Sequence, residues 1–365
     1  LLQQVLLLLQ QVLLLLQQVL LLLQHLLRLQ QVLPLTMNNE IHPFSVLTPS
    51  YIMDAVESQG YVCDGRISAL NSYENRVYQI GLEDQDVPLI AKFYRPQRWS
   101  VDQIMEEHRF SIALAEYELP VVPPMVNKQG GSLLSYENFQ FALFERKGGH
   151  GPELDNLENL YTMGRLLGRI HALGAVESYQ HRPSINPQTF GHDSVAFVSQ
   201  HFIPESLKAA YDSLTADLLV HIDAAFTQND SVDYIRVHGD CHGGNLLWRD
   251  VAPHIVDFDD SRMAPAVQDI WMLLSGEPDR QRIQLSEIIE GYNEFYDFKP
   301  QELALVEPLR TLRMLYYAAW LSRRWEDPAF PHSFPWFNTE RYWGEHILEL
   351  REQLSALNEP VMELI

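Results

Sequence analysis

The stretch that decides the fold is residues 237–260, VHGDCHGGNLLWRDVAPHIVDFDD. Asp240 follows His238 by two residues, and Asn245 comes five residues after that aspartate. Asp257 then lies in the apolar run IVDF, which is typical of a buried β-strand. A carboxylate, an amide and a second carboxylate are therefore spaced along one loop and the strand that follows it.

This spacing matches the H-x-D-x-x-x-x-N loop of phosphoryl-transfer enzymes, which precedes a metal-binding aspartate. Transfer from ATP needs a carboxylate that orients and deprotonates the accepting hydroxyl group, and Asp240 is the candidate. Mg²⁺ takes carboxylate, amide and water oxygens, so we predict Asn245 and Asp257 as its ligands. Asp240 and Asp257 are thus the predicted catalytic carboxylates. The alternative is an ordinary acidic loop with a β-hairpin, which a lone H-x-D would favour and the full set does not.

A lysine upstream of this loop fits nucleotide binding. Lys92 lies in LIAKFY, residues 89–94, and an ammonium group on a largely apolar strand needs a partner. In the V-A-I-K pattern of kinases the partners are phosphate and a helix glutamate. Glu106 and Glu107 on the next predicted helix are the candidates, and we favour Glu107. The alternative is that Lys92 lies on the solvent-exposed face of its strand.

The polar stretch NSYENRVY, residues 71–78, precedes this lysine between two predicted strands. It occupies the place of a loop that covers the phosphates, although it lacks the glycines of G-x-G-x-x-G. Backbone amides and the Ser72 hydroxyl group can contact phosphate oxygens, so we predict Ser72 as an ATP-binding residue. A polar hairpin turn without a ligand is the alternative.

The order of predicted elements divides the chain into two lobes. Residues 37–146 alternate helical patterns with strand-like runs, which indicates an α+β lobe on an antiparallel sheet. Residues 147–365 are mostly helical in pattern, with one strand-like interruption at 235–260. We therefore predict an α+β, two-lobed protein-kinase-like fold. The small antiparallel-sheet N-lobe binds nucleotide, and the mostly helical C-lobe carries the catalytic loop and the substrate site.

Residues 1–36 are a low-complexity segment in which VLLLLQQ at 5–11 repeats at 12–18. Five of seven positions are apolar and no charges set a register, so the pattern is a poor coiled coil. Paired glutamines disfavour a membrane span, and no signal-peptide features are present. We interpret the segment as an artefact of a misplaced start upstream of Met37. A membrane-seeking or self-associating helix is the alternative.

Composition and charge limit the partners. Hydrophobic residues make up 46% and charged residues 20%, as in a folded protein. The net charge of −22 argues against binding of nucleic acid or of an anionic membrane. No apolar run in residues 37–365 is long enough to span a bilayer. Only two cysteines, Cys63 and Cys241, are present, which excludes a disulfide scaffold and suits the cytoplasm.

HGDCHGGN together with IVDFDD resembles the aminoglycoside phosphotransferase and choline kinase-like superfamily, whose members are relatives of eukaryotic protein kinases. Four stretches resemble, more closely, the bacterial stress response kinase A family. They are LNSYENRVYQ (70–79), KFYRPQRW (92–99), PAVQDIWMLL (265–274) and YYAAWLSRRWEDPAFP (316–331). The resemblance covers essentially all of residues 37–365.

This resemblance implies an ATP-dependent serine/threonine protein kinase that is cytoplasmic, monomeric and active in the stress response. Its protein substrate is not named by the sequence. Carried over residue by residue, Asp240 accepts the proton, Asn245 and Asp257 bind Mg²⁺, Ser72 lies in the ATP site and Lys92 holds the α- and β-phosphates.

The last implied role belongs to Asp269, which would hold the backbone of the catalytic loop. We also expect Arg323 and Arg324, in the fourth family-like stretch, to form salt bridges with acidic groups.

Two other functions stay open on sequence grounds. One is a small-molecule kinase that phosphorylates an aminoglycoside, choline or a homoserine-type hydroxyl acceptor, since the catalytic motif does not separate these substrates from proteins. An acidic cleft would attract such cationic molecules. The other is a non-catalytic ATP-binding regulator, in which the nucleotide only shifts a conformational equilibrium.

Overall fold

The computed structural model describes residues 43–249 and 252–364. The interpretation of residues 1–36 as a start-site artefact lies outside the described residues and stays a prediction. The chain separates into two compact units, Leu1–Ser45 and Val46–Ile365, and the fold given below is that of the second. No helix in the described part of the chain has the length and apolar character needed to cross a membrane.

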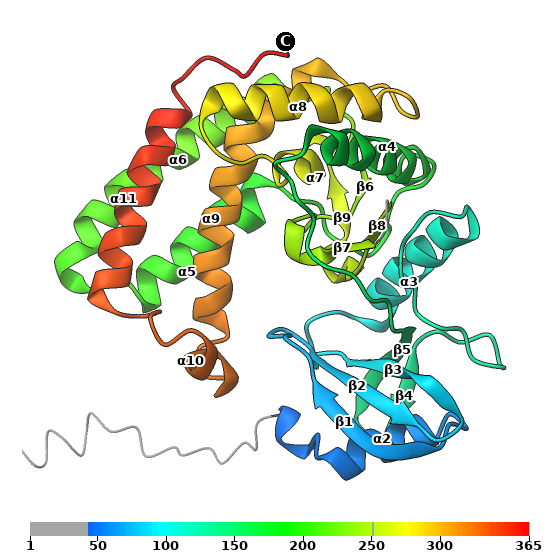
Figure 1. Cartoon of the computed structure of the whole chain (residues 1–365). Coiled ribbons are helices and arrows are strands. Elements are labelled where there is room, and N and C mark those ends of the chain that lie inside the picture. The colour runs from blue at the N-terminus through cyan, green and yellow to red at the C-terminus, as the bar shows by residue number, and fades with distance from the viewer. Residues whose placement is uncertain (1–42, 250–251, 365) are drawn as a thin grey trace, which may run out of the picture. The chain divides into compact units, whose positions relative to one another are not determined.

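The N-terminal lobe is built on a five-stranded antiparallel sheet with the strand order β1-β2-β3-β5-β4 (Figure 1). Its strands are β1 (Cys63–Ala69), β2 (Arg76–Leu82), β3 (Gln85–Phe93), β4 (Leu134–Tyr136) and β5 (Phe139–Glu145). Helix α2 (Pro49–Glu57) precedes the sheet, and helix α3 (Val101–Glu116) connects β3 to β4. This arrangement confirms the predicted antiparallel-sheet lobe.

A capping box fixes the start of α3. Ser100 Oγ accepts the backbone N–H of Gln103 at 3.2 Å, and Gln103 Oε1 accepts the backbone N–H of Ser100 at 2.9 Å. With its first turn fixed in this way, α3 buries both Glu106 and Glu107 on its inner face. Glu106 and Glu107, the two candidate partners of Lys92, are therefore both buried.

The C-terminal lobe is mostly helical, as predicted. Its helices are α4 (Leu157–Gly174), α5 (Asp193–His201), α6 (Glu205–Gln228), α7 (Val267–Trp271), α8 (Pro278–Tyr292), α9 (Val306–Arg323), α10 (Ala329–Ser333) and α11 (Glu340–Ala356). Single turns of 3-10 or π helix occur at Pro43–Val46, Pro187–His192, Gly243–Asn245, Phe258–Asp260 and Pro300–Leu305.

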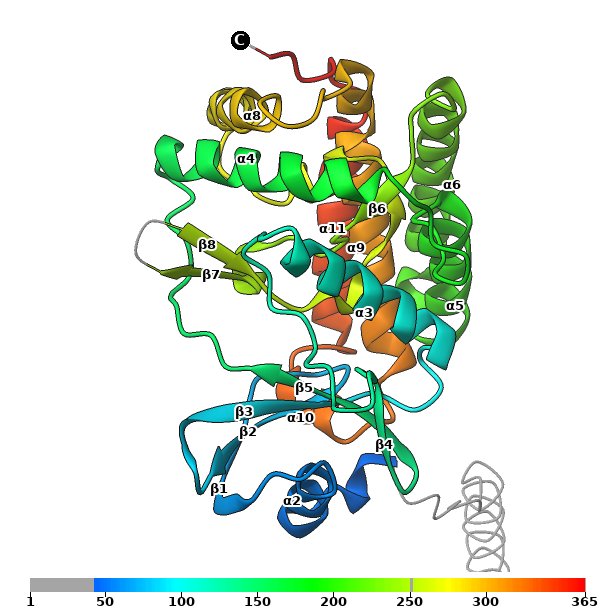
Figure 2. The ribbon, with the colours of Figure 1, turned by 90° about the vertical axis from the view of Figure 1, so that its right-hand side faces the viewer.

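Two short antiparallel ribbons interrupt the helices in the region where the sequence predicts strands. β6 (Ile235–Val237) pairs with β9 (Arg262–Ala264), and β7 (Leu246–Arg249) pairs with β8 (Ala252–Ile255). Figure 2 shows β7 and β8 between helix α4 and the N-terminal sheet. Residues 146–156 connect β5 to α4 without a helix or named strand, and the exact lobe boundary within them stays a prediction.

Glycines bring helix α4 into direct backbone contact with its neighbours. A Cβ atom added at Gly164 or Gly168 would meet the backbone of Ile288 or Tyr292 in α8. Gly174, at the end of α4, approaches the backbone of β6 in the same way. Because β6 leads directly into the catalytic loop, this close packing positions the loop relative to the helical core.

We expect Gly164→Ala to lower the free energy of unfolding by about 1–3 kcal/mol, because the new methyl group forces α4 and α8 apart. Gly344→Ala is the matched control in the middle of α11, where no described atom lies within 4 Å of the added Cβ. It should raise the free energy of unfolding by up to about 1 kcal/mol, because alanine is the better helix former. Urea denaturation followed by circular dichroism measures both changes, and stabilisation by Gly164→Ala would contradict the packing argument.

Candidate active site

The catalytic loop follows β6, and Asp269 of α7 holds its backbone. Asp269 Oδ2 accepts the backbone N–H of His238 at 2.7 Å, and Asp269 Oδ1 accepts that of Gly239 at 2.8 Å. His171 of α4 contacts the same carboxylate at 3.1 Å, and the group is fully buried. The predicted role of Asp269 is therefore confirmed. Gly239 has a φ angle of 84° and no room for a Cβ beside the carbonyl of Asp260, so glycine is required there.

The next residue, Asp240, faces the cavity with both oxygens in polar contacts. Oδ1 lies 2.6 Å from Arg313 Nη2 of α9. Oδ2 lies 3.4 Å from His242 Nε2 and accepts a hydrogen bond from Asn245 Nδ2 at 3.4 Å. Because His242 Nδ1 accepts the backbone N–H of Gly244 at 2.9 Å, its proton lies on Nε2, facing Asp240.

These contacts keep Asp240 ionised. Burial by itself would raise the pKa of Asp240, but the hydrogen bond from His242 and the charge of Arg313 outweigh burial and hold that pKa well below its ordinary value. A low pKa makes the carboxylate a weak base. It suits a group whose main task is to orient an accepting hydroxyl group during phosphoryl transfer.

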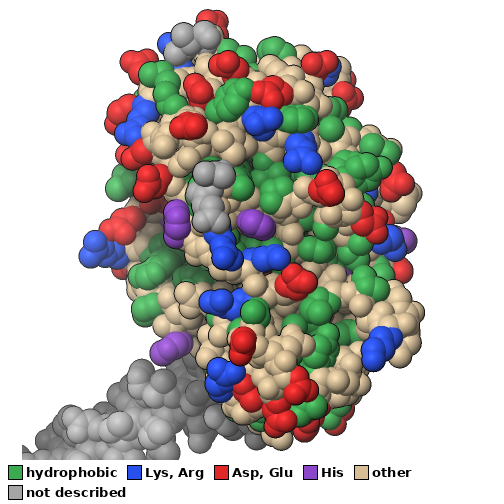
Figure 3. Space-filling view, turned by 45° about the vertical axis from the view of Figure 1, so that its right-hand side comes forward, with side chains coloured by type: hydrophobic (Ala, Val, Ile, Leu, Met, Phe, Trp, Pro, Cys, Tyr) green, Lys and Arg blue, Asp and Glu red, His purple; other side chains and the backbone are tan. Residues whose placement is uncertain are grey.

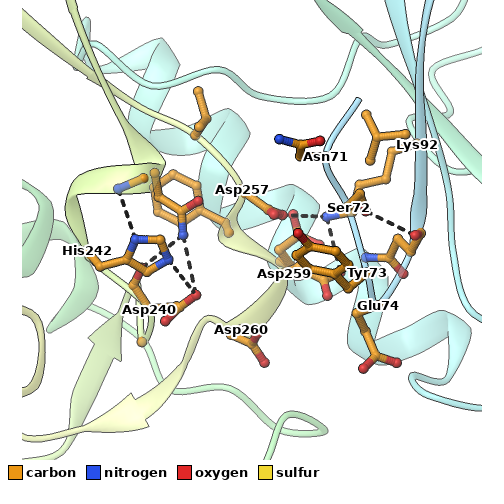
Figure 4. A pocket seen from close by; sticks show the side chains of 18 of the residues that line it. Asn71, Ser72, Tyr73, Glu74, Lys92, Asp240, His242, Asp257, Asp259 and Asp260 are labelled. Carbon is orange, nitrogen blue, oxygen red and sulfur yellow. Dashed lines mark hydrogen bonds and ion pairs between the residues drawn. The ribbon is translucent and has the colours of Figure 1, made fainter. Parts of the chain in front are cut away.

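The predicted metal ligands lie on two segments joined by a backbone hydrogen bond. The N–H of Val256, the residue before Asp257, donates to the carbonyl of Asn245 at 3.0 Å. Asn245 Nδ2 donates to the carbonyl of Asp240 at 2.9 Å, which leaves its amide oxygen for a metal. Asp257 has left-handed backbone, with a φ of 63°, and its half-exposed side chain points into the cavity (Figure 4).

This donor set fits Mg²⁺. The described residues contain no group of three or more His, Cys, Asp or Glu side chains that would form an all-protein cage. Mg²⁺ typically uses one or two protein oxygens and takes the rest from phosphates and water. Asn245 and Asp257 provide such a pair at the edge of the cavity.

Lys92 is a buried cation of the site. Its side chain is 6% exposed, and Nζ lies 2.7 Å from Asp257 Oδ1 and 3.2 Å from Asp259 Oδ1 (Figure 4). Burial by itself would lower the pKa of Lys92, but the two aspartates outweigh burial and raise that pKa well above its ordinary value. Lys92 is therefore charged, and the solvent-exposed alternative is wrong.

The structure corrects the predicted partner of this lysine. In the described part of the chain, no ion pair joins Lys92 to Glu107 or to Glu106. Glu107 does line the cavity, but its nearest cation is Arg182, with 3.7 Å between Oε2 and Nη2. Burial raises the pKa of Glu107 to about 7, and the carboxylates within ion-pair distance of Lys92 are those of Asp257 and Asp259.

Glu106 has a different task on the same helix. Its carboxylate accepts the backbone N–H groups of Gln180, His181 and Arg182 at 2.6 to 3.1 Å. It therefore anchors the segment that follows α4. Of the two candidate glutamates, only Glu107 lines the cavity.

Ser72 lies in the loop between β1 and β2. Its Oγ donates to the carbonyl of Asn75 at 3.0 Å, which closes the turn. Asn75 Oδ1 in turn accepts the backbone N–H of Arg95 at 3.0 Å. The hydroxyl group of Ser72 thus shapes a loop that lines the cavity, where the sequence predicts a cover for phosphates.

One cavity of about 740 Å³ joins the predicted residues, and this volume is typical of a small-molecule site. It is lined by all six of them: Ser72, Lys92, Glu107, Asp240, Asn245 and Asp257. One part of its wall is apolar and includes Ile90, Val122, Phe144, Leu247 and Val256. Helix α9 contributes another part with Arg313, Tyr316, Tyr317 and Trp320.

Sequence reasoning missed two groups that the structure places at the centre of this site. Asp259 is buried and pairs with both Lys92 and Arg98. Its signal in the sequence is the second aspartate of IVDFDD, two residues after Asp257. Arg313 has no motif around it, and only the fold brings it from α9 to Asp240.

Comparison with known proteins places this geometry in a family. The phosphotransferase enzyme family, APH, matches residues 66–306. Stress response kinase A of Escherichia coli K12 is 45% identical over 329 residues, which cover 90% of this chain and 99% of the relative. Serine/threonine protein kinase RdoA of Salmonella typhimurium LT2 is 44% identical over 331 residues, with the same coverage of 90% and 99%.

Solved structures agree on the fold. An amicoumacin kinase, hAmiN, in complex with AMP-PNP, Ca²⁺ and Ami has a TM-score of 0.66 at 17% identity and covers 86% of this chain and 95% of its own. A microcompartment-associated aminopropanol kinase has a TM-score of 0.65 at 18% identity and covers 86% and 100%. The family match and the relatives at 44–45% identity, by contrast, show that the chain is a kinase that belongs to the phosphotransferase enzyme family and, within it, to the stress response kinase A family.

Proposed function

We propose that this protein is an ATP- and Mg²⁺-dependent protein kinase that phosphorylates serine or threonine side chains and acts in a bacterial stress response. The observation that carries the proposal is the single cavity in which Asp240, Lys92, Asn245 and Asp257 meet. The names of the relatives that are 44–45% identical support a protein substrate and the stress response. A monomeric, cytoplasmic protein without nucleic-acid partners is part of the same proposal.

The cavity divides into parts that suit the parts of ATP. The apolar wall suits the adenine ring, because it is lined by aliphatic and aromatic side chains. Lys92 is charged and lies beside Asp257, so its ammonium group suits the phosphates. Asn245 and Asp257 would hold Mg²⁺, which when bound neutralises charge on the phosphate oxygens. These residues thus supply binding and electrostatic stabilisation.

Asp240 orients the acceptor. Its ionised carboxylate accepts the hydrogen bond of the substrate hydroxyl group and takes up the proton as the new oxygen–phosphorus bond forms. Arg313 and Asn245 hold the carboxylate from two sides, which fixes its orientation before the substrate arrives. Most of the rate enhancement then comes from positioning.

The charges around the cavity support a neutral hydroxyl side chain over a cationic amine as the acceptor. In the described residues, each carboxylate that lines the cavity forms an ion pair with a lysine or arginine. These carboxylates are Glu74, Glu107, Glu145, Asp240, Asp257, Asp259 and Asp260. An amino-sugar or amino alcohol would have to displace one of these cations to gain an ion pair.

The two rival functions have weaker support. The small-molecule kinases that share the fold are only 17–18% identical to this chain, so they bear on the fold and not on the acceptor. A non-catalytic regulator would have no need for an acceptor-orienting carboxylate. Asp240 is nevertheless present, ionised and held by Arg313, which favours catalysis.

Asp240→Asn is expected to lower the turnover number by at least ~100-fold, because the variant cannot accept the hydroxyl proton, and to leave ATP affinity within about threefold. The assay follows labelled γ-phosphate from ATP, with a generic basic protein and a panel of amino-sugars and amino alcohols as acceptors. Asp155→Asn is the control, because Asp155 is exposed and pairs with Arg280 on the surface.

The acceptor that becomes labelled decides between the functions. Label on protein that disappears in Asp240→Asn supports the protein kinase. Label on a small molecule instead would move the chain to the metabolite and antibiotic kinases of its superfamily. Binding of ATP with full turnover in Asp240→Asn would contradict the role of this residue.

Asp257→Ala is expected to abolish the gain in ATP affinity that Mg²⁺ provides, because the carboxylate ligand is lost. Calorimetric titration of ATP with and without Mg²⁺ measures this gain. Asp240→Asn serves as the matched control and should keep it. An Asp257→Ala variant with the Mg²⁺ dependence of the parent would show that the metal binds elsewhere.

A further inference from the structure

Three of the four family-like stretches meet at one buried carboxylate. Glu74 lies in the loop between β1 and β2, and its side chain is 11% exposed. Arg95, in the second stretch, reaches Glu74 Oε1 with Nε at 2.8 Å. From the far end of α9, Arg324 Nε reaches the same oxygen at 3.0 Å, and Trp320 Nε1 donates to Glu74 Oε2 at 2.5 Å.

This loop therefore has partners in both lobes. Arg95 follows β3 of its own lobe, whereas Trp320 and Arg324 belong to the C-terminal lobe. A second carboxylate, Asp327, repeats the pattern: it pairs with Arg95 at 2.6 Å and with Arg76 at 3.2 Å. The segment that ends α9 is thus attached to the loop and to the strand that follows the loop.

Further ion pairs connect Glu74 to Lys92. Arg98 lies 3.9 Å from Glu74 and forms ion pairs with Asp259 and Asp260. Asp259 in turn pairs with Lys92 at 3.2 Å. A continuous path of ion pairs therefore leads from the end of α9, through the loop, to the ammonium group at the centre of the cavity.

Helix α9 also reaches the opposite side of the site. Trp320 and Arg324 follow Arg313 by seven and eleven residues, and Arg324 is the residue directly after α9. At 3.6 residues per turn, these spacings place the three side chains along one face of the helix and its C-terminal cap. The first of them contacts Asp240, and the other two contact Glu74. Figure 4 shows Asp240 and Glu74 on separate sides of the pocket, with Asp259 and Asp260 between them. One rigid element thus touches both the acceptor side and the loop side.

We propose that Trp320 and Arg324 are positioning residues for ATP, which act through Glu74 to hold the loop of residues 71–75 over the phosphates. The inference rests on the ATP binding proposed above. In this loop the glycines of other kinases are missing, so side-chain contacts set its position. A loop held in its binding position before ATP arrives loses less conformational freedom when ATP binds, and the affinity is correspondingly higher.

Two substitutions distinguish the hydrogen bond of Trp320 to Glu74 from the charge of Arg324. Trp320→Phe removes the donor to Glu74 without a change of charge and keeps an aromatic ring against Phe330 and Phe334. Arg324→Gln removes the cation that pairs with Glu74. Each variant is expected to weaken Mg·ATP binding by about tenfold, which corresponds to one hydrogen bond to a charged group. The double variant should be weaker than either single variant by no more than about threefold, because both act through one carboxylate.

Arg323→Gln is the matched control, because this neighbour turns away from the loop. Its Nη2 donates to the carbonyl of Asp193, and its guanidinium group lies over Phe197. Calorimetry on the full chain measures the Kd of Mg·ATP, and thermal unfolding checks that every variant is folded. In the transfer assay, KM for ATP should rise in Trp320→Phe and Arg324→Gln, while kcat at saturating ATP stays within about threefold.

The outcomes separate this inference from the proposed function. If the parent binds Mg·ATP and the Trp320→Phe variant binds it with unchanged Kd, the proposed positioning role of Trp320 is wrong. An equal loss of affinity in Arg323→Gln would overturn the inference too, since it would assign the effect to overall charge. A parent without affinity for Mg·ATP would overturn the proposed function, and the inference with it.

Discussion

The ammonium group of Lys92 is the charge around which the two lobes are arranged. It is carried by β3 of the sheet lobe and is almost completely withdrawn from water, so it requires anionic partners. Its own lobe offers Glu107, whose pKa is raised to about 7 by burial, but the carboxylates that pair with Lys92 come from the helical lobe instead. The ion pairs with Asp257 and Asp259 therefore bring the sheet against the catalytic segment, and the cavity forms where they meet.

The ion pairs of Lys92 are connected to the other parts of the site through further contacts. Asp259 is shared with Arg98, Arg98 approaches Glu74, and Glu74 is bound by the end of α9. The other part of α9 brings Arg313 to Asp240. The loop of residues 71–75, Lys92 and Asp240 are thus linked through one helix and one set of ion pairs, which is a suitable basis for the proposed reaction, since phosphoryl transfer depends on positioning.

The predicted site residues that the structure brings together from one segment are those whose spacing along the chain is short. Asp240, Asn245 and Asp257 lie within 18 residues of one another, and the turn and strand between them leave few arrangements. The role of Asp269 was implied by the resemblance and is borne out by its two hydrogen bonds to the loop backbone. The preference for Glu107 as the ion-pair partner of Lys92 was wrong, because order along the chain does not reveal which carboxylates the fold brings within ion-pair distance.

The sequence by itself determined the catalytic motif, the two-lobed fold and the family, because each depends on local spacing and on hydrophobic patterns that a single chain displays. Only the tertiary structure decided which charges meet. Arg313 is 73 residues from Asp240, and Arg324 is 250 residues from Glu74, so no local pattern relates them. Their pairing depends on the packing of α9 against the rest of the protein. In a buried site, the choice among several aspartates and arginines is set by distance and by loss of solvent, which are properties of the folded chain.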